Sequence, residues 1–202
     1  MMHDSLKKGP INDILALSNI DPILNSPHSN VSFFFSKYSD TKSNHGRRIV
    51  IEINRDNLTI ESIIKNISEL RPDEELSVLS LIKVDNIIYH IPMIDFLAKK
   101  RTESTVIALK QTSEFWGIEF NIYDSGRSIH AYGTKLLTYN QWINFMGYLI
   151  LLNPKSGEKV TDTRWIGHRL MSGYASLRIT NNTRKYKSIP VYIGSTTGDI
   201  LI

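Results

Sequence analysis

The 202-residue chain contains no cysteine. This absence excludes a disulfide framework and any zinc or iron–sulfur site with cysteine ligands, and it agrees with a reducing compartment. Long hydrophobic runs are also missing: the longest, Phe145 to Leu152, is far too short to span a bilayer. The N-terminal segment lacks the continuous apolar stretch of a signal peptide. We therefore expect a soluble, cytoplasmic protein with no membrane partner.

Hydrophobic residues make up 41% of the chain and charged residues 22%. This is enough apolar material for a core that needs no covalent cross-links. The length suits one large or two-lobed domain. The net charge of +4 is unevenly distributed, because residues 155–190 hold eight Lys and Arg residues against two acidic ones. A basic C-terminal third suggests a polyanionic partner, although an ordinary solvated basic surface explains the same charges.

Apolar residues at helical spacing predict a helix over residues 57–70, which the polar segment 71–75 ends. Residues 76–97 read as a β-hairpin around the turn at 85–86. The pattern over 101–115 is ambiguous, and a helix is favoured there. Strands follow at 116–123 and 128–133, and helices at 138–152 and 162–174. The last strands are expected at 175–182 and 187–193. Hairpin-paired strands with helices over one sheet face indicate an α+β fold, with two sheet-bearing lobes and a cleft.

Three polar side chains stand where a sheet normally takes an apolar or neutral residue. Asp95 ends an apolar strand, where a carboxylate can point into a cleft or simply start a turn. His130 lies inside a strand, where a hydrogen-bonded structural role is the simpler reading. Asp162 stands at a loop-to-helix junction, where it can cap the helix without losing the ability to bind a metal.

The tight turn Ser125-Gly126-Arg127 directly precedes the strand that carries His130. A glycine turn exposes backbone N–H groups, and the guanidinium of Arg127 adds a planar pair of donors. This turn is therefore a candidate phosphate-binding element.

The order of these elements is more specific than any one of them. PMIDF around Asp95, SIH from Ser128 to His130 and VTD ending at Asp162 resemble the three motifs of the archaeo-eukaryotic primase superfamily. The stretch SGRSIH is similar to that family's turn and Ser-x-His strand. The continuation DTRWIGHRLMSGYASLRIT resembles the segment that follows the last acid in bacterial primase-polymerase-like proteins. The resemblance covers about residues 78–202.

The resemblance implies a primase-like core with its site in the cleft. Residues 78–202 would form an RRM-like unit carrying the motifs, and residues 1–77 an N-terminal α/β unit. Asp95 and Asp162 would hold catalytic Mg²⁺ or Mn²⁺, which bridges the phosphates of a nucleoside triphosphate and promotes nucleotidyl transfer. His130, counted with the two acids as catalytic, would also contact those phosphates together with Ser128 and Arg127.

The first motif departs from the family pattern, because it should supply a second acid two residues after Asp95, and Leu97 stands there. Glu119 and Asp124 are stand-ins that no motif supports, and Asp85 lies in the hairpin turn. Two carboxylates can hold one metal ion, but two ions on two carboxylates would be poorly neutralised. Full polymerase chemistry therefore rests on an incomplete acidic set.

The basic third supplies the expected contacts to a template or primer backbone. Six residues are assigned to this role: Arg164, Arg169, Arg178, Arg184, Lys185 and Lys187. For the helix at 162–174, charges that merely rim a core face are an equal alternative. For residues 178–190, an ordinary Asn-rich hairpin is almost as good an explanation.

Two functions remain open. The first is a metal-dependent nucleotidyltransferase that makes or extends primers on single-stranded DNA or RNA. The second is a catalytically decayed primase-like module that binds nucleotide or single-stranded nucleic acid within a larger defence or mobile-element system, with a helicase or effector as protein partner. A hydrolase with His130 as general base lacks a convincing nucleophile.

Overall fold

The computed structural model describes residues 9–14, 24, 30–39, 48–97 and 102–197. It is an α+β fold built on two antiparallel sheets, so the expected fold class is confirmed. The RRM-like character of one unit stays a prediction, as does the division between residues 77 and 78, a position that falls inside strand β3. None of the described helices combines the length and apolar character that a membrane span requires.

The first sheet has the order β2-β1-β3-β4-β8, with β9 also paired to β3. Its strands are β1 (Val31–Ser39), β2 (Arg48–Asn54), β3 (Glu74–Val84), β4 (Ile87–His90), β8 (Leu137–Thr138) and β9 (Ser176–Arg178). The central strand β3 is buried along almost its whole length, because β1 pairs along one edge and β4 and β9 along the other. Burial on both faces explains why apolar side chains such as Val78 and Leu79 stand at successive positions of this strand.

The second sheet has the order β10-β6-β7-β5. It consists of β5 (Met93–Asp95), β6 (Phe120–Asp124), β7 (Ile129–Gly133) and β10 (Val191–Ser195). The turn at 85–86 joins β3 to β4 as expected, but the chain leaves the first sheet after His90 and enters the second as β5. The expected hairpin therefore divides between two sheets, and Asp95 belongs to the second.

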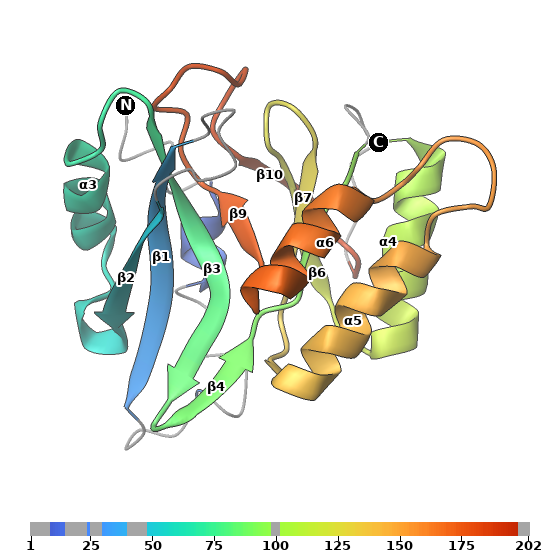
Figure 1. The fold of residues 1–202 in the computed structure, drawn as a ribbon, viewed down its shortest axis with the longest axis horizontal. Helices are drawn as coiled ribbons and strands as arrows, with labels where there is room; N and C mark the ends of the chain where they lie inside the picture. Colours follow the sequence, from blue (N-terminus) through green and yellow to red (C-terminus); the bar gives the residue numbers. More distant parts are fainter. Residues whose placement is uncertain (1–8, 15–23, 25–29, 40–47, 98–101, 198–202) are drawn as a thin grey trace.

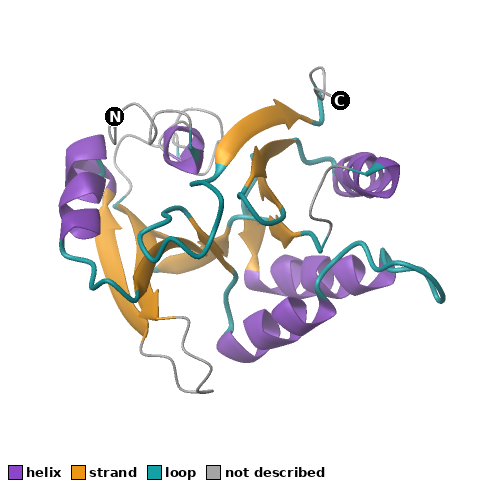
Figure 2. Ribbon diagram, turned by 90° about the horizontal axis from the view of Figure 1, so that it is seen from above, coloured by secondary structure: helices purple, strands orange, loops and turns teal. Residues whose placement is uncertain are grey.

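After β2, the described helices are α3 (Ile60–Ser68), α4 (Glu103–Trp116), α5 (Tyr139–Leu151) and α6 (Thr163–Ser172), with a 3-10 turn η1 (Arg55–Asn57) before α3. Residues 10–14 are also helical. Capping boxes at Thr59 and Thr138 start α3 and α5, because each threonine and the residue three positions later satisfy each other's backbone N–H. Figure 1 places α3 beside the first sheet and α4, α5 and α6 together at the other side of the molecule. Figure 2 shows the same separation from above.

One continuous apolar core extends through both sheets and the helices packed on them. Trp142, Phe145, Met146 and Leu149 of α5 are fully buried, as their spacing predicts. The helix α6 packs against α5, and its residue Ile166 is fully buried. This packing fixes the start of α6 relative to the end of β5.

Candidate active site

Asp95 is the last residue of β5 and lies opposite His130 of β7 in the strand register. Beyond Asp95 the chain stays fixed: the Phe96 amide donates to the Ile129 carbonyl at 3.0 Å, and Phe96 forms an isolated bridge with Thr161. A strand end held on both sides gives the carboxylate a defined direction.

Asp162 immediately precedes α6, and a backbone hydrogen bond links it to Asp95. Its carboxylate oxygen Oδ1 accepts from the amides of Arg164 and Trp165, at 2.9 and 3.0 Å, so it is the N-cap of the helix. Its own amide donates to the Asp95 carbonyl at 3.4 Å. Helix capping and proximity to Asp95 are thus combined in one residue.

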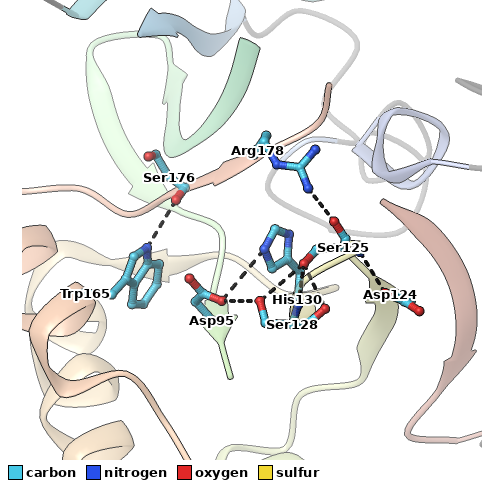
Figure 3. A network of polar contacts seen from close by, with 9 residues as sticks. Asp95, Asp124, Ser125, Ser128, His130, Trp165, Ser176 and Arg178 are labelled. Carbon is cyan, nitrogen blue, oxygen red and sulfur yellow. Dashed lines mark hydrogen bonds and ion pairs between the residues drawn. The ribbon is translucent and has the colours of Figure 1, made fainter. Parts of the chain in front are cut away.

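The turn 125–128 brings Ser128 to Asp95 (Figure 3). The Ser125 hydroxyl donates to the Ser128 carbonyl at 2.8 Å and accepts the Ser128 amide at 3.0 Å, which closes the turn. Gly126 has a φ of 78°, a left-handed conformation that favours glycine. The Ser128 hydroxyl then donates to Asp95 Oδ1 at 3.1 Å.

Burial sets the charge state of this group of residues. It raises the pKa of Asp95 to about 7; the hydrogen bond from Ser128 opposes the rise, and the negative charge of Asp162 adds to it. Burial, followed by the positive charge of Arg178, lowers the pKa of His130 to about 3. His130 is therefore neutral near pH 7, and its Nε2 lies 3.8 Å from Asp95 Oδ1. Its buried Nδ1 has no hydrogen-bond partner among the described residues.

A groove of about 880 Å³ opens over these residues, with walls from both sheets and from α6. The structure brings seven of the site residues expected from sequence into its lining: Asp95, Arg127, Ser128, His130, Asp162, Arg169 and Arg178. Four others are exposed and lie outside the lining: Arg164, Arg184, Lys185 and Lys187. The stand-in acids Glu119 and Asp124 do not line the groove either, nor does Asp85 of the hairpin turn, whereas Leu97 does.

Arg178 connects the two sheets rather than pointing freely into the groove. It is 5% exposed, and its guanidinium donates to the carbonyls of Thr180 and Ser125. The ring of Tyr186 covers it, with Cζ 3.6 Å from the ring centroid. The hydrogen bonds and the ring contact indicate a structural role for Arg178, and its positive charge still acts on His130 in the groove.

Arg48 is the residue of the groove that sequence reasoning missed. It starts β2, and its guanidinium donates to the hydroxyls of Ser36 and Ser176 at 2.6 and 3.2 Å. Arg169 of α6 donates to the same Ser176 hydroxyl at 3.0 Å. None of the ion pairs between described residues involves either arginine. No local motif marks Arg48, since only the pairing of β2 with β1 carries it to the groove.

The side chains that could coordinate a metal ion provide a test of the expected metal site. Within the described residues, no group of three or more His, Asp or Glu side chains is arranged to hold a metal ion. The negative charge of Asp162 contributes to the raised pKa of Asp95, so a cation bound in this part of the groove would be attracted by both carboxylates. The two carboxylates do not fit a pair of metal ions held by protein ligands alone.

Comparison with known proteins gives one family. No curated protein and no solved structure matches the chain significantly. A family model described as archaeo-eukaryotic primase 1D-like matches residues 54–191, well over half of the chain. This match begins upstream of residue 78, where the motif resemblance starts, and it includes β3 and α3. The chain belongs to the archaeo-eukaryotic primase 1D-like family, and this membership supports a primase-like function on nucleic acid.

Proposed function

We propose that the groove binds a nucleoside triphosphate and that the protein transfers its nucleotidyl group to a nucleic-acid strand in a metal-dependent reaction. The observation that carries the proposal is the lining of the groove, where Asp95, Asp162 and His130 meet the turn 125–128. Family membership makes nucleic acid the natural partner. The pairing of two acids with several cations in one groove is what a metal-bound polyphosphate requires.

Arg48 and Arg169 support phosphate binding. Both guanidinium groups share the hydroxyl of Ser176, a neutral acceptor that compensates neither charge. Burial lowers the pKa of Arg169, and the nearby charge of Arg48 adds to this effect. Its buried Nε has no hydrogen-bond partner among the described residues. An anionic ligand would relieve this repulsion, so the phosphates are assigned to this end of the groove.

Asp95 and Asp162 would hold a single Mg²⁺ or Mn²⁺ ion together with the phosphates. Bound there, the ion would neutralise phosphate charge and favour attack by a strand 3′-oxygen. Because burial raises the pKa of Asp95 to about 7, an ion that binds at neutral pH must compete with a proton. Ser128 favours the ionised form of Asp95 through its hydrogen bond.

His130 contributes a neutral hydrogen-bonding group. Since burial lowers its pKa to about 3, it cannot act as a cation toward phosphate at neutral pH. One of its two ring nitrogens carries a proton and can donate, and the residue lines the groove. We assign His130 to orienting a phosphate oxygen beside Asp95.

A second candidate is a primase-like module that binds nucleotide or single-stranded nucleic acid without catalysis, as a subunit of a larger system. Leu97 favours it, because this side chain is 43% exposed and lines the groove at the position of the family's second acid. An apolar group there supplies no ligand for another metal ion. Helicase or effector partners belong to this candidate.

Primer extension on single-stranded DNA distinguishes the two candidates. With Mn²⁺ and all nucleotides, we expect the wild-type protein to give product and Asp95→Ala and Asp162→Ala to give none. Glu114→Ala, which removes an exposed carboxylate of α4 outside the groove, is the matched control and should retain activity. If no metal ion supports product formation while nucleotide and single-stranded DNA still bind, the second candidate is correct.

A further inference from the structure

Glu75 of β3 is a fully buried carboxylate that takes part in no ion pair between described residues. Its oxygen Oε2 accepts from the Thr180 hydroxyl and from the Asn182 amide, the latter at 3.0 Å. Its Oε1 accepts from the Thr183 amide and hydroxyl at 2.9 and 2.6 Å. A buried carboxylate is costly unless its acceptor sites are filled, and here one short segment fills them.

The segment that Glu75 holds is the start of the loop 180–188, which follows β9. Further along, the Asn181 side chain and the Tyr186 backbone exchange two hydrogen bonds of 2.9 and 3.2 Å. This closed loop fixes Tyr186 with its ring over the guanidinium of Arg178. The shape of the loop therefore determines whether Arg178 is covered.

The end of the loop rests on the turn 125–128. The Lys187 amide donates to the Gly126 carbonyl at 3.4 Å, and Arg178 donates to the Ser125 carbonyl. A Cβ placed on Gly126 would lie 2.5 Å from the backbone nitrogen of Ser188, so loop and turn are in close contact. The same turn directs Ser128 to Asp95 (Figure 3).

We propose that Glu75 is a positioning residue: by holding the loop 180–188 it fixes the turn 125–128 and so aims Ser128 at Asp95. The connection is a continuous series of contacts from Glu75 through the loop and Arg178 to Ser125. Glu75 touches neither groove nor ligand, and no primase motif includes it. The inference rests on the proposed function in one respect: that function gives the hydrogen bond from Ser128 to Asp95 a chemical role.

Glu75→Gln tests the inference with little change in size. The amide NH₂ replaces one acceptor oxygen and must face a backbone N–H that cannot reorient, so at least one contact to the loop is lost. The matched control is Glu74→Gln: Glu74 is also buried, but among the described residues its side chain accepts only from the nearby Arg71 amide, at 3.0 Å. Both variants remove a buried charge from β3, and only one removes the hold on the loop.

The readout is amide hydrogen exchange at Ser125 and Ser128, compared with Ile122 in the same sheet. In Glu75→Gln we expect the exchange rate at the two turn amides to rise about tenfold or more. The loss of a hydrogen bond to a charged group changes an equilibrium constant by at least about that factor. Ile122 should exchange as in the wild type, and Glu74→Gln should leave all three unchanged. A purely global loss of stability would instead move all three amides together and would overturn the proposal.

A second pair of variants applies if Glu75→Gln does not fold. Tyr186→Ala removes the ring over Arg178 while leaving the contacts of Glu75 intact, and Tyr186→Phe retains the ring. We expect faster exchange at Ser125 and Ser128 in Tyr186→Ala alone. Unchanged exchange in Tyr186→Ala would overturn the proposed connection.

Nucleotide binding, measured on the same proteins, separates this inference from the proposed function. Faster turn exchange in Glu75→Gln, with no nucleotide bound by any of the proteins, supports the positioning role and rejects the proposed function. Nucleotide binding by the wild type, with turn exchange unchanged in Glu75→Gln, does the reverse. Weaker nucleotide binding in Glu75→Gln together with faster turn exchange supports both.

Discussion

At the scale of single residues, Asp95 is the group whose chemistry depends most on its surroundings. Its carboxylate ends a short strand among buried neighbours, receives one hydrogen bond from Ser128 and lies near the charge of Asp162. Burial therefore keeps the carboxyl partly protonated near pH 7 until a cation replaces the proton. A metal site built this way is sensitive to pH in the neutral range.

This charge state has a consequence for stability without metal. In the unfolded chain Asp95 ionises near pH 3.8, and in the folded chain near pH 7, so rising pH between these values favours the unfolded state. Asp95→Asn removes this effect. From pH 5 to pH 8 we expect its free energy of unfolding to increase relative to wild type by about 3 kcal/mol, because the two pH units between pH 5 and the folded pKa each correspond to about 1.4 kcal/mol.

Urea denaturation with a chelator present measures the difference. Asp73→Asn, which alters an exposed carboxylate outside the groove, is the control and should follow the wild type at both pH values. Parallel pH dependence of Asp95→Asn and wild type would show that the carboxyl is ordinarily ionised in the folded protein.

Single residues also show which parts of the site can be predicted from the sequence and which cannot. Asp95, His130 and Asp162 can be singled out because each breaks a local pattern, and the structure places all three on one groove. Arg48 and Glu75 break no local sequence pattern. Their hydrogen-bond partners lie far away in the chain. Their roles depend on tertiary contacts, which local spacing does not encode.

At the scale of elements, the turn 125–128 and the loop 180–188 form one unit across the two sheets. Gly126 makes this contact feasible for two separate reasons: its positive φ and the absence of a Cβ beside Ser188. A comparison with Gly173 separates these reasons. Gly173 has a similar φ of 76° at the end of α6, but a Cβ there would meet nothing within 4 Å.

We expect Gly173→Ala to lower the free energy of unfolding by about 1 kcal/mol, the cost of a left-handed alanine. Gly126→Ala should lose about 3 kcal/mol or more, because the added Cβ also forces the backbone at Ser188 to move. Chemical denaturation of both variants gives the difference. Equal losses would mean that the loop does not rest on the turn in solution.

The elements show where sequence patterns are reliable. The helix α3 forms where apolar spacing predicts it, and α4 forms in a segment whose pattern is ambiguous but favours a helix. Each helix begins after a Thr N-cap, which is a local interaction. The last two strands do not pair as a hairpin: β9 joins β3 and β10 joins β6. Strand pairing depends on the whole sheet, and the intervening Asn-rich segment is an anchored loop held by Glu75 instead.

At the scale of the whole molecule, charge is divided between the groove and a separate exposed set. Arg48, Arg169 and Arg178 line the groove, whereas Arg184, Lys185 and Lys187 lie exposed on the loop 180–188. This arrangement suits a nucleotide in the groove and a strand backbone along the loop. The two ligands should therefore respond differently to salt.

Single-stranded DNA binding should weaken linearly with the logarithm of salt concentration. Replacing Arg184, Lys185 and Lys187 with Gln should reduce the slope by about 2, since each phosphate contact to a single strand contributes about 0.7. Replacing Lys65, Lys110 and Lys135 removes the same charge from other surfaces and is the control. Equal slopes in the two triple variants would show that the loop is not the strand-binding surface.

The central claim, that the groove holds a nucleoside triphosphate with a divalent cation, is tested most directly by calorimetric titration with a non-hydrolysable nucleoside triphosphate and Mn²⁺. We expect one site per chain, with affinity reduced about tenfold or more by Asp95→Ala and by Arg48→Gln, since charge-assisted contacts are the strong ones. Glu114→Ala should bind like the wild type. Absence of binding, or equal binding by all four proteins, would contradict the claim.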